Sequence, residues 1–212
     1  STVQVSARKG RLYRFSADYR NIAYFEALPS FAAPLLERGL ALSERSFDIR
    51  RRMSNLELEL RPGSRLIPYL AYGRSSESGN GVTTFVTDAN EYPLPQRIRD
   101  SAGNYRGGIR FEMPRFHLTL EQGGTTFRDD QQVYKSSGAR NIGNNNVPIF
   151  GQSLSLSNLE QAYGIRGTSV YSKGLFTASP VSWADLYAQF LYSQPASDVN
   201  YQQFNTGTFV VL

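Results

Sequence analysis

The sequence offers few side chains from which a catalytic or metal site could be built. It contains no cysteine and a single histidine, His117. These counts exclude disulfides, thiolate ligands, covalently attached haem and a multi-histidine metal site. His117 and Glu112 flank the pair Met113-Pro114, and a histidine beside a carboxylate is the minimum for acid–base chemistry. No nucleophile or oxyanion-stabilising group can be identified beside them, so we predict that the chain is not an enzyme.

Two acidic segments carry oxygen ligands of the kind that calcium takes. Asp88, Asn90 and Glu91 lie in one polar stretch, and Asp129 and Asp130 lie in another. Their spacing matches no known calcium loop, and acidic loop residues are normally solvated. The sequence therefore predicts no cofactor, and calcium in the long loops stays an open question.

Basic residues are numerous, and nearly all of them are arginine. Of 23 basic residues 20 are Arg, and the formal net charge is +5. The one dense run, Arg50-Arg51-Arg52, has the donors to touch phosphate groups of lipopolysaccharide or of nucleic acid. The other arginines are spread along the chain and alternate with apolar residues. We therefore rank nucleic-acid binding last and expect no nucleic-acid partner.

The elements that carry these residues are predicted to be strands. Polar and apolar side chains alternate with a period of two, which places them on opposite faces of a strand. The alternation is clear at residues 13–20, 104–112, 116–121 and 185–192, and weaker at 163–171, where the odd positions are read as apolar. A change of phase between Phe47 and Leu56 indicates either a bulge near Arg50 to Asn55 or the meeting of two elements there, and we favour the bulge. Residues 31–42 favour a short helix or an irregular loop.

The connections between these strands alternate between short and long. Tight turns are predicted at residues 8–10, 61–64, 113–114 and 178–180, and long polar loops at roughly 22–45, 74–103, 122–160 and 195–206. In an antiparallel meander this order puts the short turns at one edge and the long loops at the other. That sorting is typical of transmembrane β-barrels. We predict an all-β fold of about nine strands, an antiparallel up-and-down transmembrane β-barrel or a segment of a larger one, with residues 1–212 as a single domain.

In a membrane barrel the apolar side chains face lipid and the polar ones line the interior. The residues that we expect to line the interior are Arg14, Asp18, Arg20, Arg106, Arg110, Glu112, His117, Glu121, Arg166 and Gln189. Aromatic residues near strand ends are expected to form girdles at the membrane interfaces, namely Tyr13, Tyr19, Tyr69, Tyr72, Tyr105, Tyr163, Tyr171, Trp183 and Tyr192. No run approaches the ~18 apolar residues of a membrane-spanning helix.

The strand count and the last residue bear on closure. Bacterial barrels have an even number of strands, and outer-membrane barrels typically end on an aromatic residue, whereas this chain ends on Leu212. We expect the chain to be a piece of a larger barrel, or a barrel closed by oligomerisation through its open edges.

Two segments resemble a known family in style. The segments Asn104 to Asp130 and Ala162 to Pro195 have Arg- and Tyr-rich strands, a short proline-containing turn and long Asn/Gly/Asp stretches. They resemble the decahaem-cytochrome-associated porins, large bacterial outer-membrane β-barrels. The resemblance covers about half the chain and includes no ligand or catalytic motif. It implies a many-stranded barrel that holds a multihaem cytochrome. This chain departs from the family in being far too short for such a barrel.

The function predicted from these patterns is a bacterial outer-membrane β-barrel, or part of one, that forms a pore or a sheath for a partner such as an electron-transfer cytochrome. Its partners would be outer-membrane lipid, further barrel strands and possible multihaem cytochromes. The alternative is a secreted soluble β-protein that binds polysaccharide or assembles into surface fibres, because aromatic-rich strands and Asn/Gly/Ser loops also suit that role.

Overall fold

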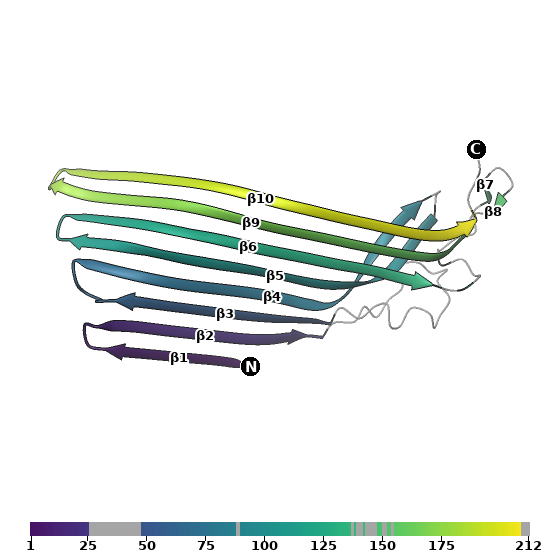
Figure 1. Ribbon diagram of the computed structural model, residues 1–212, viewed down its shortest axis with the longest axis horizontal. Coiled ribbons are helices and arrows are strands. Elements are labelled where there is room, and N and C mark those ends of the chain that lie inside the picture. Colours follow the sequence, from purple (N-terminus) through teal and green to yellow (C-terminus); the bar gives the residue numbers. More distant parts are fainter. Residues whose placement is uncertain are drawn as a thin grey trace.

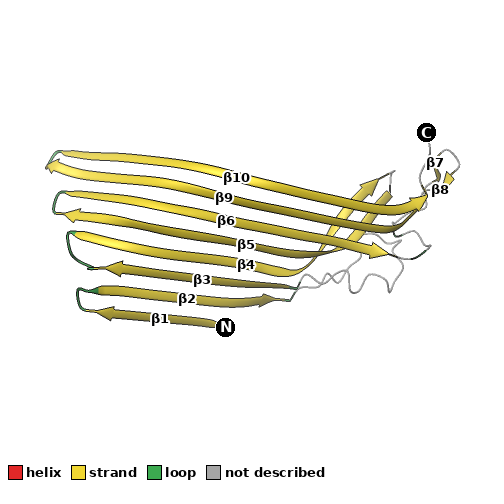
Figure 2. Cartoon of the chain, viewed as in Figure 1, coloured by secondary structure: helices red, strands yellow, loops and turns green. Residues whose placement is uncertain are grey.

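The computed structural model describes residues 1–25, 48–87, 90–136, 138, 142, 148–149, 152–153 and 155–208. Within these residues every regular element is a β-strand, and Figure 2 shows strands and connections with no helix. None of the described residues belongs to a helix long and apolar enough to cross a membrane. The all-β prediction is therefore confirmed for the described part of the chain. Residues 31–42, for which a short helix or loop was predicted, lie outside it.

Eight strands form one antiparallel up-and-down sheet in the order β1-β2-β3-β4-β5-β6-β9-β10. They are β1 (Thr2–Lys9), β2 (Tyr13–Tyr24), β3 (Ile49–Leu60), β4 (Leu66–Thr87), β5 (Asn90–Met113), β6 (Phe116–Ser136), β9 (Ser155–Val181) and β10 (Ala184–Thr208). Two short strands, β7 (Pro148–Ile149) and β8 (Gln152–Ser153), pair with each other. Figure 1 shows the long strands running side by side along the molecule, with the short connections at one end and β7 and β8 at the other.

Three short connections overlap the predicted turns, since residues 10–12, 61–65 and 114–115 join the strands, and the fourth does not. β1 and β2 are joined at Gly10, which has a φ of 48°, and β3 and β4 are joined across Gly63, which has a φ of 80°. Glycine adopts these left-handed values without steric cost. The turn predicted at residues 178–180 is wrong, because β9 continues to Val181. The pairing of β9 with β10 shifts register between Ala184 and Leu186, so this segment is an irregular end of the strands.

The strands are much longer than the alternation predicts. Most of the stretches expected as long loops are paired strand in the structure, since β4 and β5 stay in register from Leu66↔Phe111 to Thr87↔Asn90. β10 likewise continues through the whole stretch from 195 to 206. These segments are rich in Ser, Gly and Asn, which disfavour strands, but cross-strand pairing decides the structure. The predicted loop at 195–206 is therefore corrected to strand. Residues 74–87 and 90–103 of the second predicted loop, and residues 122–136 and 155–160 of the third, are likewise strand.

One further prediction about the strands, a bulge in β3, is corrected. β3 pairs without interruption with β2 from Ile49↔Tyr24 to Leu60↔Tyr13, so there is no bulge between Arg50 and Asn55. Ile49 simply lies on the opposite face from Leu56. Among the described residues the main sheet has eight strands, against the predicted total of about nine. Its last strand, β10, is described to Thr208, and residues 209–212 lie outside the described part.

The register defines two faces of the sheet, because directly paired residues lie side by side and successive residues point to opposite faces. One face carries a continuous set of apolar side chains across all eight strands, and we call it the apolar face. Its members include Val5, Phe15, Leu58, Leu70, Ile109, Leu120, Phe176 and Phe190. The other, the polar face, includes Arg14, Glu59, Tyr69, Arg110 and Glu121.

Burial on the two faces is inverted relative to a water-soluble sheet. On the apolar face Leu70 is 61% exposed, Leu120 50% and Phe190 62%. On the polar face Tyr69 and Glu59 are each 8% exposed. A soluble sheet buries its apolar face. Here the apolar side chains, whose exposure to water is unfavourable, are the exposed ones.

A small hydrophobic cluster lies at the end of the sheet opposite the short turns. Leu94, Val133, Ile142, Leu156 and Leu159 are buried there, with Phe85 packed against them. In Figure 1 the ends of β4 and β5 turn away from the direction of the other strands in this region. The cluster ties β4, β5, β6 and β9 together beyond the region where the apolar face is continuous.

The sheet is not closed. Among the described residues β1 pairs with β2 alone and β10 pairs with β9 alone, so both outer strands present unpaired backbone groups. β10 offers the longer edge, at 25 residues. Such edges pair readily with other strands.

Candidate functional site

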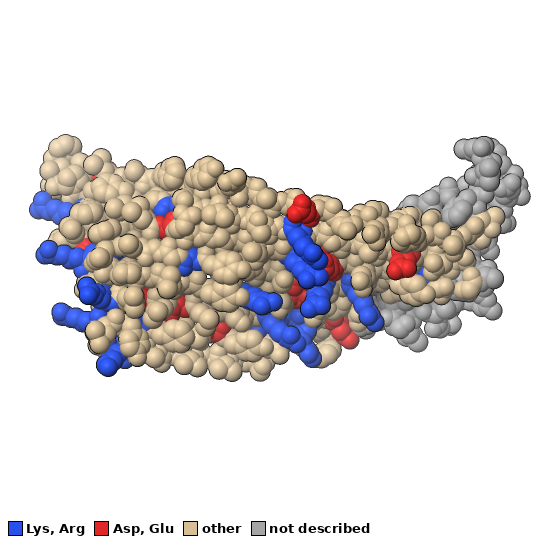
Figure 3. Space-filling view, in the orientation of Figure 1, with Lys and Arg blue, Asp and Glu red and all other residues tan. Residues whose placement is uncertain are grey.

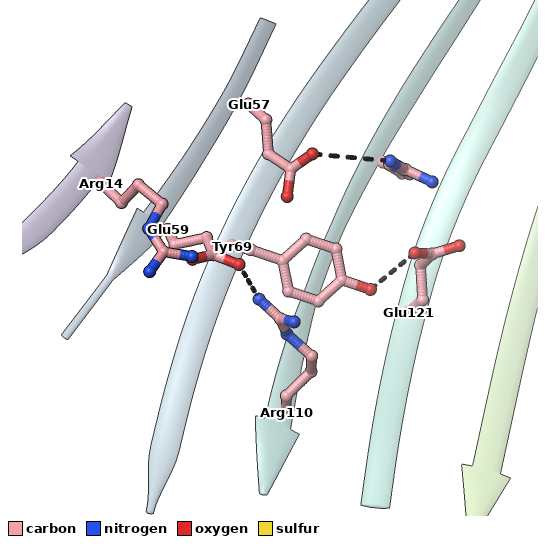
Figure 4. A network of polar contacts seen from close by, with 7 residues as sticks. Arg14, Glu57, Glu59, Tyr69, Arg110 and Glu121 are labelled. Atoms are coloured by element: carbon pink, nitrogen blue, oxygen red, sulfur yellow. Dashed lines mark hydrogen bonds and ion pairs between the residues drawn. The ribbon is translucent and has the colours of Figure 1, made fainter. Parts of the chain in front are cut away.

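The polar face carries a network of charged and tyrosine side chains near the short turns. Figure 4 shows its members pointing toward one another from neighbouring strands, with Arg14 from β2, Glu59 from β3, Tyr69 from β4, Arg110 from β5 and Glu121 from β6. Each strand contributes polar residues at every second position, so the local alternation alone places them on one face.

Glu59 is the centre of one half of the network. Its carboxylate accepts a hydrogen bond from Nη1 of Arg14 at 3.3 Å and pairs with Nη2 of Arg110. The Glu59 side chain is only 10% exposed, whereas Arg14 is 55% exposed. A carboxylate held out of water in this way is stable because two guanidinium groups face it.

Glu121 is the centre of the other half. Its two oxygens accept hydrogen bonds from the hydroxyl of Tyr69 at 2.6 Å and from the hydroxyl of Tyr171 at 3.1 Å. Arg110 joins the halves, because its guanidinium carbon lies 5.3 Å from the centre of the Tyr69 ring, a cation–π distance. The network therefore links six strands, from β2 to β9.

Two glycines make room for the tyrosines. A Cβ at Gly108 would lie 2.7 Å from the Tyr69 hydroxyl, and a Cβ at Gly123 would lie 2.4 Å from the Tyr171 hydroxyl. Each ring therefore passes over the glycine of a neighbouring strand. Tyr69 reaches Glu121 across Gly108 of β5, whereas Tyr171 passes over Gly123 and reaches Glu121 on the same strand, β6. The absence of a side chain at these positions is a packing requirement of the network.

Looser charge pairs surround this core. Arg106 and Glu57 lie 3.9 Å apart and are both nearly half exposed, and Lys173 is the direct partner of Glu121 across the β6–β9 ladder. The interleaved signs hold neighbouring strands in register, as opposite charges on paired residues do. The arrangement stiffens the sheet and gives its polar face a mixed, hydrophilic character.

The residues that the sequence predicts as interior-lining nearly all share this face. Arg14, Asp18, Arg20, Arg106, Arg110, Glu112, His117, Glu121 and Gln189 lie on the polar face. Arg166 is the exception. It pairs directly with Arg128 and Asp198, which places it on the apolar face. The weak alternation at 163–171 was assigned to the wrong phase, because the register of β9 is set by Phe176 and Val170.

The predicted aromatic girdle divides between the two faces. Tyr13, Tyr19, Tyr72, Tyr105 and Tyr192 lie on the apolar face, and Tyr72 stacks on Tyr105 with ring centres 5.5 Å apart. Trp183 lies in the last short turn and is 85% exposed. Tyr69, Tyr163 and Tyr171 are corrected to the polar face, where two of them serve Glu121.

Sequence reasoning missed four members of the network, namely Glu57, Glu59, Tyr69 and Tyr171. The alternation of polar and apolar residues in β3 and β4 could have identified the first three. Glu57, Glu59 and Tyr69 each stand next to a leucine in the sequence (Leu56, Leu58 and Leu70), and therefore point to the opposite face. The bulge assumed in β3 removed that signal. For Tyr171 the neighbouring residues are too uniformly small to fix a phase.

The structure adds no support for acid–base chemistry at Glu112 and His117 or for a metal site in the two acidic segments. Glu112 and His117 are direct partners across the β5–β6 ladder, as predicted. No hydrogen bond or ion pair joins their side chains in the described part of the chain. Asp88 lies outside the described residues, and the structure does not describe the side chains of Asn90 and Glu91. Among the residues described, no three His, Asp or Glu side chains are grouped as metal ligands.

Comparison of the chain with protein-family models, with curated protein sequences and with solved structures found no match.

Proposed function

We propose that the chain forms part of the wall of a bacterial outer-membrane β-barrel, with its apolar face toward lipid and its polar network toward the interior. The observation that carries this proposal is the inversion of burial, in which a continuous apolar face lies exposed while Tyr69 and the carboxylate of Glu59 are buried on the polar face. In water such a surface would cost about 25 cal/mol for each Å² left uncovered. In lipid that cost disappears.

The dimensions of the apolar face support the proposal. Its apolar part begins directly after the short turn and extends to the level of Tyr72, Tyr105 and Val170. On β6 this corresponds to Phe116 to Gly124, with Gln122 as a polar interruption. That is nine residues, and a tilted strand of about 9–11 residues spans a bilayer. The stacked rings of Tyr72 and Tyr105 lie at its far limit, level with Gly124, where aromatic girdles are found in barrels. Polar residues begin immediately beyond.

The strands continue well past this limit. β9 has 27 residues and β10 has 25, about twice what a bilayer needs. Short turns mark the periplasmic side of such barrels, so the extensions would stand on the outer side. A wall of this height suits a sheath around a partner such as an electron-transfer cytochrome, or a pore with a tall vestibule. The open edges of β1 and β10 are where further strands would complete the barrel.

Fractionation with mild detergent, followed by electrophoresis of heated and unheated samples, tests this function. A membrane-associated protein whose mobility changes only on boiling is the expected result. A monomer that stays soluble without detergent and does not change mobility would contradict it. That result would favour the alternative, a secreted β-protein that binds polysaccharide or assembles into fibres through its edge strands.

A further inference from the structure

A band of arginines crosses the apolar face directly beyond its apolar part. In Figure 3, Lys and Arg gather at the end of the molecule with the short turns and again across the middle, with a largely uncharged area between. The register places the residues of the middle group on one face, in successive ladder positions after Tyr72 and Tyr105. We call them the arginine band: Arg50, Arg52, Arg74, Arg97, Arg99, Arg128 and Arg166.

The band has few acidic partners. Asp130 forms an ion pair with Arg128 and is the ladder partner of Arg99. Asp198 is the ladder partner of Arg166 without an ion pair within 4.0 Å. None of the other arginines of the band forms an ion pair with a carboxylate that the structure describes. Arg128 and Arg166 are themselves direct partners across β6 and β9. Like charges at paired positions destabilise a sheet unless an anion lies between them.

The positive excess belongs to this face alone. At the same level on the polar face, Arg51 lies 3.9 Å from Glu77, and Asp100 and Asp129 are ladder partners. Because successive residues of a strand point to opposite faces, the run Arg50-Arg51-Arg52 is divided between the two faces. Two of its guanidinium groups belong to the arginine band and the third is balanced on the other side.

A hollow crosses the band. It has a volume of about 1030 Å³ and is lined by six arginines of the band (Arg50, Arg52, Arg97, Arg99, Arg128 and Arg166), by the amide residues Asn200 and Gln202, and by three aspartates (Asp48, Asp130 and Asp198). The six guanidinium groups outnumber the three carboxylates, so the hollow keeps an excess of positive charge. Planar guanidinium groups match the oxygens of a phosphate in pairs, and they are the preferred donors where phosphate is bound. The hollow therefore has the donors and the space for more than one phosphate group.

We infer that the arginine band binds the phosphate groups of a phosphorylated glycolipid of the lipopolysaccharide type, whose acyl chains lie along the apolar part of the same face. The inference rests on the proposed function. A lipid is favoured over a free anion because the basic hollow and the apolar surface are continuous on one face. The outer leaflet is assigned because the band lies on the side of the long extensions, away from the short turns.

The test measures binding of bisphosphorylated lipid A to the full chain in mild detergent, with fully dephosphorylated lipid A and inorganic phosphate as the other probes. Replacing Arg52, Arg99 and Arg166 together by Gln should weaken lipid A binding at least about tenfold. The same three changes to Lys should retain most of it, and raising the salt concentration should weaken binding to the wild-type chain. The matched control replaces Arg11, Arg65 and Arg115, which lie in the short turns, by Gln and should leave binding unchanged.

Three results would overturn the inference. They are equal affinity for the dephosphorylated lipid, undiminished binding by the Gln variant, or inorganic phosphate that binds as tightly as lipid A and displaces it. Folding of each variant is checked by its unheated electrophoretic mobility, and the Lys variant and salt series decide the matter if the Gln variant does not fold. Flotation with vesicles of neutral phosphatidylcholine tests the proposed function separately, because a barrel wall inserts there with or without the arginine band.

Discussion

Tyr69 on β4 reaches across β5, over Gly108, to donate a hydrogen bond of 2.6 Å to Glu121 on β6. One side chain thus links three strands, and it does so only because the middle strand has no side chain at the crossing point. The relationship shows how the polar face is built. Aromatic and charged side chains extend from one strand to the next, and the small residues beneath them provide the space.

Filling the crossing point should loosen this part of the sheet. Gly108→Ala places a Cβ 2.5 Å from the carbonyl oxygen of Leu120 and 2.7 Å from the Tyr69 hydroxyl, so both must move. We expect a loss of about 1–3 kcal/mol of unfolding free energy, the usual cost of overpacking. Denaturant unfolding in detergent, followed by the mobility of unheated samples, measures it.

Gly107→Ala is the matched control for that change. A Cβ there meets the flexible end of Leu70 at 2.9 Å, which can rotate away. The loss should be clearly smaller than for Gly108→Ala. Equal losses would mean that the ring of Tyr69 does not lie over Gly108.

Neutralising Glu59 should cost far more than neutralising Glu57. The two residues are on the same strand and face, but Glu59 is 10% exposed between two arginines, whereas Glu57 is 44% exposed and 3.9 Å from Arg106. Glu59→Gln leaves Arg110, whose buried Nε already lacks a partner among the described residues, without its carboxylate. We expect a loss of roughly 2–4 kcal/mol, against less than about 1 kcal/mol for Glu57→Gln.

The same denaturant titration compares the two variants side by side. Similar midpoints for Glu59→Gln and Glu57→Gln would contradict the placement of Glu59 at the centre of a covered charge network.

A charge placed in the apolar part of the apolar face should oppose membrane insertion. Ala188 and Ala196 both lie on this face of β10, the first between Leu186 and Phe190 and the second beyond the apolar part. Ala188→Arg should cost about 2 kcal/mol or more, and Ala196→Arg close to zero, because the cost of a lipid-facing charge falls toward the interface. Folding yields in phosphatidylcholine vesicles give the comparison, and equal yields would argue that this face does not meet lipid.

The strands, most of their turns and their up-and-down order could be predicted from the sequence, because alternation and glycine-containing turns are local signals. The lengths of β4, β5, β9 and β10 could not be predicted. Beyond the apolar part both faces are polar, so the contrast that reveals a strand is lost although the ladder continues. The pairing that holds these extensions is a property of neighbouring strands far away in the sequence.

The candidate site was predicted only in part, for related reasons. Arg14, Arg106, Arg110 and Glu121 follow from clear alternation. Arg166 was assigned to the wrong face because the positions around it are occupied by Gly, Ser and Thr, which carry little preference for either face. A register fixed by Phe176, ten residues away, decides where Arg166 points. That long-range information is absent from any single segment.

The central claim is that the apolar face meets lipid, and thiol labelling tests it most directly because the chain has no native cysteine. Leu120→Cys and Thr119→Cys place single thiols on opposite faces of β6, and Ser182→Cys in the last short turn is the reactive control. The label is a water-soluble maleimide, applied to phosphatidylcholine vesicles that have been made permeable to it. We expect Ser182→Cys to be labelled and Leu120→Cys to be protected. The protection should be lost when the vesicles are dissolved and the chain is unfolded. Thr119→Cys then reports whether the interior is open to water.

Rapid labelling of Leu120→Cys in intact membranes, at the rate of Ser182→Cys, would contradict the account, because a side chain 50% exposed in the structure would then face water and not lipid.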